Sequence, residues 1–275
     1  MRIGAHLRTP GGLRTAVETA RDIGAEVVQL FISNPRARAG PRTDTAEAFG
    51  AVWREGRIGP LYAHAPYLVN VASPNPEFLT KSLDLCRSSV AACGAIPAAG
   101  FVVHAGAGGA GERAAAVERA AAVLAATLAE TPESTRLSVE LMAGTSGAVA
   151  STLAEARELF DAVDDERLGL VLDTCHLFAT GYALDRAEGV DACFEELASE
   201  GLASRLALIH LNDAKHQRGS RRDRHERIGE GRIGLDGFSA ILHRPEVAGL
   251  DLVLETPSDR EQRIRELDTL RHLAS

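Results

Sequence analysis

Short apolar runs alternate with helical stretches eight times along the chain, and this order constrains the fold more than any other feature of the sequence. Several runs are apolar throughout, such as Leu168–Leu172, which is typical of parallel strands covered on both faces. Eight β/α units within about 250 residues are typical of a closed TIM barrel, and an open, doubly wound sheet is the alternative. The runs that we predict to be strands are Arg2–His6, Val27–Phe31, Leu61–His64, Phe101–His104, Leu137–Glu140, Gly169–Asp173, Leu206–His210 and Leu252–Glu255.

The segments between these runs carry recognisable helix starts. Ser151-Thr-Leu-Ala-Glu155 has the spacing of a capping box before an apolar run. No Ser/Gly-rich linker and no break in composition separates the units, so we expect one domain over residues 1–275. No apolar run reaches membrane-spanning length, and the first residues resemble a strand rather than a signal peptide, so we expect a cytoplasmic protein with no membrane partner. Predicted helices include Leu13–Ile23, Asn75–Cys93, Ala114–Ala129 and Asp259–Leu273.

Histidine and carboxylate side chains cluster at the ends of the predicted strands. Six of them end six consecutive strands. A closed barrel would bring these ends around one mouth, whereas an open sheet would spread them along a line. The positions therefore favour a single α/β domain, a (β/α)8 TIM barrel with a metal cluster at the carboxyl-terminal face of its strands. The full series of candidate ligands is His64, His104, Glu140, Asp173, His176, His210, Asp223, His225 and Glu255.

The donor types of this series indicate a multinuclear metal centre. Four carboxylates in one barrel mouth would repel each other and lose hydration unless cations were bound between them. Imidazole and carboxylate donors suit Zn²⁺, and one ion needs only three or four protein ligands. Asp173 and His176 are expected to point into the mouth across a two-residue turn, and Asp223 and His225 from one extended segment. Multinuclear centres usually act on phosphate esters or other hydrolysable bonds.

The four cysteines contain no Cys-x-x-Cys pair. We therefore expect free, buried or half-buried thiols in a reducing cytoplasm. Cys175 lies beside the candidate ligand His176, but we do not expect it to act as a nucleophile because the metal cluster offers a better hydrolytic device.

The net charge of −8 at first argues against a nucleic-acid partner. The charge is unevenly placed, however, because six Lys and Arg face only two acidic residues between Lys215 and Arg227. Bound divalent cations would add positive charge to the same region. We therefore expect phosphate contacts from this segment, with Lys215 and Arg224 as the leading candidates. The basic residues are Lys215, Arg218, Arg221, Arg222, Arg224 and Arg227.

At these positions the chain resembles the endonuclease IV family of apurinic/apyrimidinic (AP) endonucleases over nearly its whole length. Every member of the family's nine-ligand trinuclear zinc set has a match. The segments that carry the resemblance are Ile3-Gly-Ala-His6, Ala63-His-Ala-Pro-Tyr-Leu-Val-Asn70, Val103-His104, Glu140, Leu172-Asp-Thr-Cys-His176, Ile209-His-Leu-Asn-Asp-Ala-Lys215, Asp223-Arg-His-Glu226, Ile228-Gly-Glu-Gly231 and Leu254-Glu-Thr-Pro257.

The resemblance implies three Zn²⁺ ions per chain, although Mn²⁺ or Fe²⁺ would also suit one position. It assigns the first ion to His64, His104 and Glu140. It assigns the second to Glu140, Asp173, His210 and Glu255, so that Glu140 bridges the pair. It assigns the third to His176, Asp223 and His225.

The same resemblance implies a DNA repair enzyme. The expected reaction is hydrolysis of the phosphodiester 5′ to an abasic site in duplex DNA, leaving a 3′-hydroxyl and a 5′-deoxyribose phosphate. Removal of blocking groups from 3′ ends would follow from the same chemistry. A water activated between the paired metals would attack in line, with Glu140 as the catalytic residue that orients it. The family expectation is a monomer.

Contacts to DNA are also implied by the resemblance. Loop residues of the family enter the minor groove and hold the abasic nucleotide outside the helix, and the matching positions here are Arg36, Tyr67 and Leu68. Flipping is easiest at an abasic site because no base must unstack. The family often has an aromatic residue after Asn-Pro-Arg, whereas this chain reads Arg36-Ala-Arg-Ala-Gly40, so lesion detection is expected to differ in detail. His6 matches a family position outside the ligand set, where we expect hydrogen bonds within the mouth.

Two other functions fit parts of the pattern. A sugar isomerase or epimerase of the xylose isomerase-like group would need Glu140, Asp173, His210 and Glu255 but not the other five candidate ligands. A DNA-binding protein with structural zinc fits less well, because structural zinc sites are closed and often rich in Cys. About one bound ion per chain would favour the isomerase, and bound metal without turnover would favour the binding protein.

Overall fold

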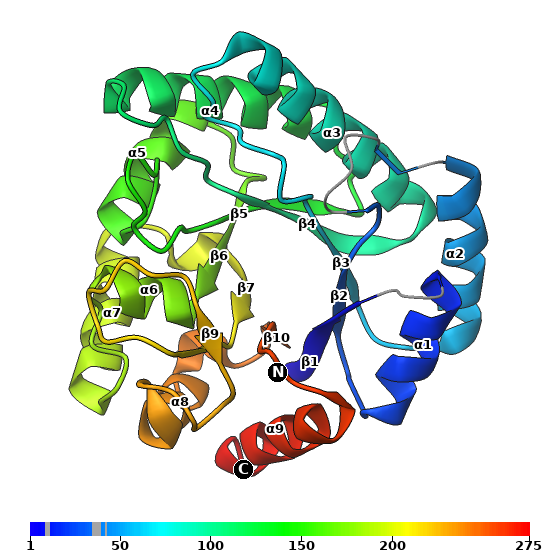
Figure 1. The fold of residues 1–275 in the computed structure, drawn as a ribbon, viewed down its shortest axis with the longest axis vertical. Coiled ribbons are helices and arrows are strands. Elements are labelled where there is room, and N and C mark those ends of the chain that lie inside the picture. Colours follow the sequence, from blue (N-terminus) through cyan, green and yellow to red (C-terminus); the bar gives the residue numbers. More distant parts are fainter. Residues whose placement is uncertain (9–11, 35–39, 42) are drawn as a thin grey trace.

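A closed barrel of parallel strands forms the centre of the molecule, and the computed structural model describes residues 1–8, 12–34, 40–41 and 43–275. The strands follow one another around the barrel in the order β1, β10, β7, β6, β5, β4, β3 and β2 (Figure 1). The (β/α)8 prediction is therefore confirmed. The barrel strands are β1 (Arg2–Leu7), β2 (Val28–Phe31), β3 (Leu61–His64), β4 (Ala98–His104), β5 (Arg136–Glu140), β6 (Gly169–Asp173), β7 (Leu206–His210) and β10 (Asp251–Leu254).

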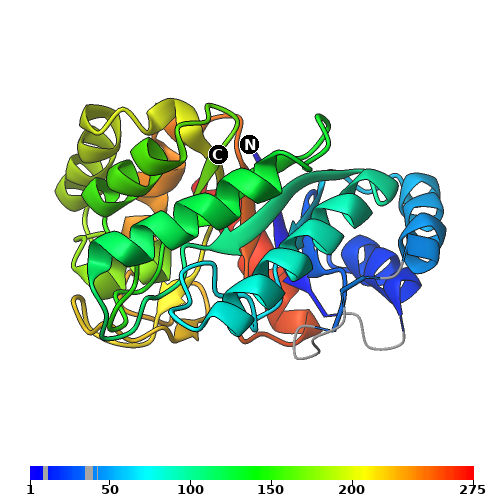
Figure 2. The same ribbon diagram turned by 90° about the horizontal axis from the view of Figure 1, so that it is seen from above.

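Helices surround the barrel in the connections between its strands (Figures 1 and 2). Side-chain caps begin several of them. Asn75 accepts from the amides of Glu77 and Phe78, and Thr152 with Glu155 forms the predicted capping box. None of the described helices is both long and apolar enough to cross a lipid bilayer. The helices are α1 (Leu13–Asp22), α2 (Thr43–Gly56), α3 (Pro76–Ala95), α4 (Arg113–Leu128), α5 (Leu153–Val163), α6 (Thr174–Thr180), α7 (Ala187–Ser199), α8 (Gly234–Leu242) and α9 (Arg260–Leu273), with single turns at Ala203–Arg205 and Pro245–Val247.

Two connections are more elaborate than the predicted alternation. Both α6 and α7 join β6 to β7, and a short antiparallel pair, β8 (Asp213–Ala214) with β9 (His225–Glu226), follows β7. The predicted two-residue turn between Asp173 and His176 is wrong. The Asp173 carboxylate accepts a hydrogen bond from the His176 amide at 3.0 Å, and this cap lets α6 begin directly at the end of β6.

The barrel interior is built in layers. Its apolar layer consists of Val27, Tyr62, Val102, Val171, Leu208 and Val253. Side chains alternate along a strand, so the residue two positions further on each strand also faces inward, nearer the carboxyl-terminal mouth. On β10 this residue is Glu255, which directly follows the last strand residue rather than ending the strand as predicted. The fold therefore aims one residue from every strand at the same mouth.

Candidate metal centre

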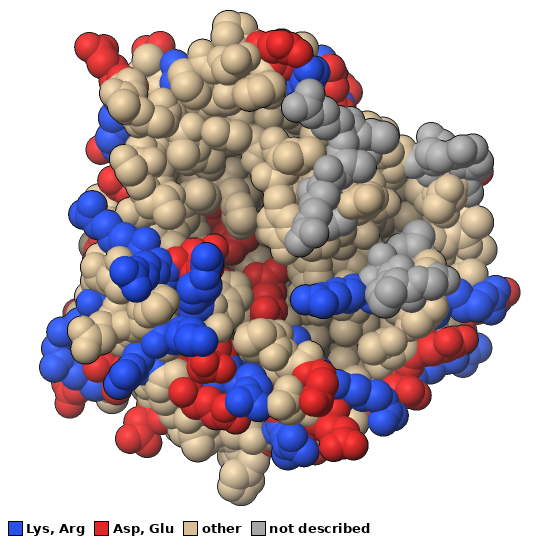
Figure 3. Space-filling model, in the orientation of Figure 1, with Lys and Arg blue, Asp and Glu red and all other residues tan. Residues whose placement is uncertain are grey.

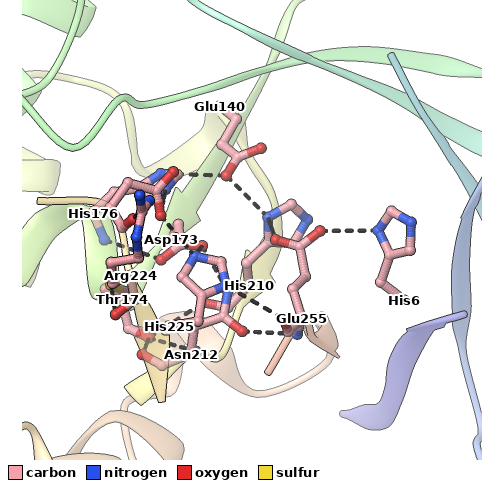
Figure 4. Close-up of polar contacts among 12 residues, drawn as sticks. His6, Glu140, Asp173, Thr174, His176, His210, Asn212, Arg224, His225 and Glu255 are labelled. Atoms are coloured by element: carbon pink, nitrogen blue, oxygen red, sulfur yellow. Dashed lines mark hydrogen bonds and ion pairs between the residues drawn. The ribbon is translucent and has the colours of Figure 1, made fainter. Parts of the chain in front are cut away.

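One polar side chain from each barrel strand lies at the carboxyl-terminal mouth. Glu140, Asp173 and His210 are completely buried there. Figure 4 shows the cluster that these residues form with Glu255 and His6. Six positions of the ring are predicted ligands, whereas His6 and Gln29 are not. In chain order the ring consists of His6, Gln29, His64, His104, Glu140, Asp173, His210 and Glu255.

The first group of donors joins the ends of β3, β4 and β5. The Nε2 atoms of His64 and His104 lie 3.1 Å and 3.2 Å from the same Glu140 oxygen, Oε2. His64 Nδ1 lies 2.8 Å from the backbone carbonyl of Ala65, which leaves its Nε2 directed at the group. These three residues can place one atom each around a single ion.

The second group shares Glu140 with the first. His210 Nδ1 lies 3.2 Å from Glu140 Oε1 and 3.3 Å from Glu255 Oε2. Asp173 completes the group, and the four donor atoms all lie within 4.8 Å of one another. The two oxygens of Glu140 therefore face different groups, which is the arrangement that a bridging carboxylate requires.

The third group lies off the barrel, on α6, in the connection between β8 and β9, and at the start of β9. His176 Nε2 and His225 Nε2 are each 3.3 Å from Asp223 Oδ1. His176 Nδ1 lies 2.8 Å from the carbonyl of Leu141, which directs Nε2 at Asp223. The Asp223 side chain is 49% exposed, in contrast to the buried carboxylates of Glu140 and Asp173.

Buried donor atoms without hydrogen-bond partners mark the second and third groups. Among the described residues they include Glu140 Oε1, His176 Nε2, His210 Nδ1 and His225 Nε2. A buried polar atom left without a partner is destabilising by about 1–3 kcal/mol. Each of these atoms faces other donors of its group, where a cation would satisfy them together. The donor set therefore fits bound metal ions, and its nitrogen and oxygen atoms suit zinc.

Imidazoles and carboxylates shift one another's pKa across the mouth. Burial acts to raise the pKa of Glu140, but the charges of His210 and His104 outweigh it and hold that pKa well below its ordinary value. Burial acts in the opposite direction on His210, yet Glu255 and Glu140 raise the pKa of His210 to about 9. Against burial, Asp173 and Asp223 likewise raise the pKa of His225 to about 9. The Glu140 carboxylate is thus held ionised, as a metal ligand must be.

A cavity of about 900 Å³ opens onto these groups. His64, His104 and Glu140 line it together with Phe31 and Tyr67. In the space-filling view acidic side chains lie in the central hollow, and Lys and Arg side chains gather along one side of its rim (Figure 3). The mouth thus combines an acidic floor with a partly basic rim.

Two of the residues predicted to contact DNA, Tyr67 and Arg224, line this cavity. Tyr67 and Leu68 are 65% and 47% exposed, and the Tyr67 ring centroid is 5.0 Å from that of Phe31. Lys215 and Arg224 are exposed, their backbones are hydrogen-bonded to each other, and Arg224 lines the cavity. Arg36 lies outside the described residues.

Several supporting residues were missed by the sequence analysis. Asn212 donates to Asp173 Oδ2 at 2.6 Å and accepts from the Glu255 amide at 2.7 Å, so it joins two candidate ligands. Gln29 is completely buried beside His210 and Glu255. The sequence signal for Gln29 was that it is a polar residue within an otherwise apolar run, Val27–Phe31. For Asn212 the sequence held no signal beyond its place after His210.

Asp213 organises the connection that carries the third group. Its carboxylate accepts from the backbone amides of Ala214, Gly229, Gly231 and Ile233 at 2.8–3.0 Å. A Cβ atom at Gly231 would lie 2.4 Å from Asp213 Oδ1, so a residue with no side chain is required there. The segment between these contacts includes Asp223, His225 and the basic residues.

The four cysteines are free and buried, as predicted. Cys175 donates a hydrogen bond to the Arg224 carbonyl at 3.6 Å. Burial, reinforced by the charges of Asp173 and Asp223, raises the pKa of the Cys175 thiol well above its ordinary value. A neutral thiol of this kind is a poor nucleophile, in agreement with the sequence analysis.

His6 makes the hydrogen bond expected of it within the mouth. Its Nδ1 atom lies 3.0 Å from Glu255 Oε1 (Figure 4). Burial lowers the pKa of His6, although Glu255 opposes the shift.

Comparisons with known proteins agree with the fold. A family model described as xylose isomerase-like TIM barrel matches residues 17–273. A probable endonuclease 4 of Methanoculleus marisnigri is 39% identical over 264 residues, covering 94% of each chain. The crystal structure of endonuclease IV from Thermus thermophilus matches with a TM-score of 0.85 and 30% identity, covering 99% of this chain and 98% of that one. A D-tagatose 3-epimerase-like protein matches with a TM-score of 0.74 at 17% identity, which shows a shared fold alone.

Proposed function

Because the chain belongs to the endonuclease IV family of xylose isomerase-like TIM barrels, we propose that it is a DNA repair endonuclease that hydrolyses the phosphodiester 5′ to abasic sites in duplex DNA. The products are a 3′-hydroxyl and a 5′-deoxyribose phosphate. The single observation that carries the proposal is the convergence of nine nitrogen and oxygen donors into three groups, with Glu140 shared by two of them. The same chemistry would remove blocking groups from 3′ ends.

Three zinc ions per chain fit these donors, one in each group. His64, His104 and Glu140 would hold the first. Glu140, Asp173, His210 and Glu255 would hold the second, and His176, Asp223 and His225 the third. Zinc ions bound there supply Lewis acidity, which lowers the pKa of water and stabilises charge that develops on phosphate oxygens. Mn²⁺ or Fe²⁺ would also suit the donors of one position.

Glu140 is the residue on which the catalytic arrangement depends. It is completely buried and ionised, and it faces imidazoles of the first group with one oxygen and His210 with the other. This position lets Glu140 fix the spacing of the two groups. The same carboxylate is placed to orient a water molecule for in-line attack on phosphorus, because it lies on the wall of the cavity.

We assign recognition of the lesion to residues at the rim of the cavity. Tyr67 and Leu68 present exposed apolar surface beside the cavity, which suits insertion into a groove at a gap in the base stack. Lys215 and Arg224 supply positive charge for phosphate contacts. An abasic nucleotide leaves the helix at the lowest cost because it has no base to unstack, so rim insertion favours this substrate. One chain contains all of these groups, and we propose that a monomer acts.

A sugar isomerase or epimerase is the competing function. It shares the fold, and the second group alone would serve it. Five further donors at the same mouth have no role in such an enzyme. The competing function is therefore less supported than the endonuclease.

A duplex with one tetrahydrofuran abasic analogue tests the proposal. The analogue cannot undergo β-elimination, so any cut must be hydrolytic. We expect a nick on the 5′ side with a 3′-hydroxyl end, lost after chelation and restored by Zn²⁺. An uncut duplex in the presence of zinc-loaded protein would contradict the proposal and favour the isomerase.

A further inference from the structure

Two of the eight ring residues at the mouth, His6 and Gln29, belong to none of the three donor groups among the described residues. Gln29 is the more deeply placed of the two and is completely buried. An uncharged amide enclosed among imidazoles and carboxylates must find hydrogen-bond partners, because an unsatisfied amide there is strongly unfavourable. Its side chain lies within hydrogen-bond distance of two members of the second group, His210 and Glu255, and of His6 Nδ1, which is 3.0 Å from Gln29 Nε2.

The amide of Gln29 can be oriented in only one way. Its Nε2 lies 2.7 Å from Glu255 Oε1, and an ionised carboxylate only accepts hydrogen bonds, so the NH₂ group must face Glu255. The Gln29 carbonyl oxygen then faces His210 Nε2, at 3.0 Å. A carbonyl oxygen only accepts, so His210 must keep its proton on Nε2 and donate it.

This arrangement decides which ligand atoms remain available. With Nε2 occupied, His210 presents Nδ1, which lies 3.2 Å from Glu140 Oε1 and 3.3 Å from Glu255 Oε2. Glu255 Oε1 is engaged by Gln29 and lies 3.0 Å from His6 Nδ1, so Oε2 is the oxygen left to face the group. One amide thus sets the tautomer of a histidine and the free oxygen of a carboxylate.

The histidines of the other groups are held differently. His64 and His176 direct Nδ1 at backbone carbonyls, at 2.8 Å in each case. A backbone carbonyl contributes one acceptor and contacts one ligand. Gln29 contacts two ligands of the same group at once, so its loss would release both.

We infer that Gln29 is a positioning residue of the second group, holding His210 Nδ1 and Glu255 Oε2 toward a common metal ion. The inference rests on the proposed metal centre and deepens it. Outer partners of metal ligands typically change metal affinity or activity about 10- to 100-fold when they are removed. The effect should be confined to the second ion, since Gln29 contacts no member of the third group among the described residues.

Zinc binding to the full chain tests the inference. The protein is equilibrated with free Zn²⁺ set by chelator buffers, and bound zinc is counted by mass spectrometry. We expect Gln29→Met to lower the affinity for one of the three zinc ions about 10- to 100-fold. The affinity for one or more of the other ions should stay near the wild-type value. Ser138→Ala is the matched control, because Ser138 is a buried polar residue of β5 one inward layer below Glu140.

Gln29→Glu gives a second variant of nearly the same size. It keeps an acceptor for His210 Nε2 but sets a carboxylate against Glu255, so the same ion should be weakened even if Gln29→Met fails to fold. Wild-type zinc affinities in either folded variant would overturn the inference about Gln29 but would leave the proposed metal centre standing. Equal weakening of all three ions would also overturn it, because a general structural role would then explain the loss. A wild-type chain that binds no zinc would overturn both the inference and the proposed metal centre.

Discussion

The first two donor groups and the third are built from different kinds of structure. Ends of barrel strands supply the first two, and Glu140, Asp173 and His210 are completely buried. The third takes its donors from α6 and from the β8–β9 connection, where the Asp223 side chain is 49% exposed. The hydrogen bonds of the closed barrel hold one region, and Asp213 holds much of the other.

The difference has a functional consequence. Strands of the closed barrel position the two buried groups, whereas candidate ligands and basic residues share one more exposed segment. We therefore expect the phosphate contacts proposed for that segment to be coupled to the third metal position.

Glu140→Gln should have the largest effect. It weakens the bridge between the two buried groups, so we expect cleavage of abasic duplex to fall about 1000-fold or more in single-turnover assays. Bound zinc should fall as well. Glu158→Gln, at an exposed carboxylate paired with Arg113, is the control and should leave activity unchanged. Near-normal cleavage by Glu140→Gln would remove Glu140 from the catalytic role.

Asp223→Ala should affect the third donor group and leave the two buried groups intact. It removes the oxygen that both His176 and His225 face, so one zinc should be lost while two remain. We expect cleavage to fall on the order of 100-fold, because the buried pair persists. Zinc counts and single-turnover rates measure the effect, with Asp161→Asn as the control on an exposed carboxylate of α5. Loss of all three ions would show that the regions are not independent.

Asp213→Asn should loosen the connection without removing a donor. The new amide group cannot accept from the backbone amides that the lost oxygen served, so residues 214–234 should exchange their amide hydrogens faster. The affinity for the third zinc ion should fall about tenfold, which is the lower end of the range expected when a residue that holds metal ligands in place is changed. Asp236→Asn, on an exposed position of α8, should change neither measurement. Unchanged exchange in Asp213→Asn would mean that Asp213 does not anchor this segment.

Zinc affinity should rise with pH in both regions. His210 and His225, each with a pKa of about 9 in the absence of metal, carry protons near neutral pH that zinc must displace. Affinity should change about tenfold per pH unit for each displaced proton, and calorimetry in two buffers should detect proton release. For the chelator-treated chain, stability against unfolding should change with pH in the opposite direction to zinc affinity. Because both pKa values are raised, the stability that they contribute is full below about 6.5 and is lost as the pH rises through about 9.

Lys215→Gln combined with Arg224→Gln should have the smallest effect. Each lost phosphate contact should reduce the slope of log affinity against log salt by about 1, and affinity for abasic duplex at physiological salt should fall several-fold. Lys81→Gln, at an ion pair with Glu77 on α3, is the control for loss of a surface charge. A slope that equals the wild-type slope would exclude these two residues from the DNA interface.

The barrel and the donors at its strand ends could be predicted from the sequence because both follow from one periodic pattern, whereas the division of the donors into three groups was implied by the family resemblance. Apolar strands ending in His or carboxylate residues, such as Leu61–His64, indicate the barrel and its mouth together. The start of α6 could not be predicted in this way, because it depends on a cap by Asp173, which also reads as a ligand. Asp213 and Gln29 were missed because their roles depend on backbone amides and side chains far away in the sequence.

Anomalous diffraction at the zinc edge, from crystals of the zinc-loaded protein, would locate each bound ion. We expect three peaks in each chain, two flanking Glu140 and one among His176, Asp223 and His225. A single peak among Glu140, Asp173, His210 and Glu255 would contradict this expectation, because that group alone would serve a sugar isomerase.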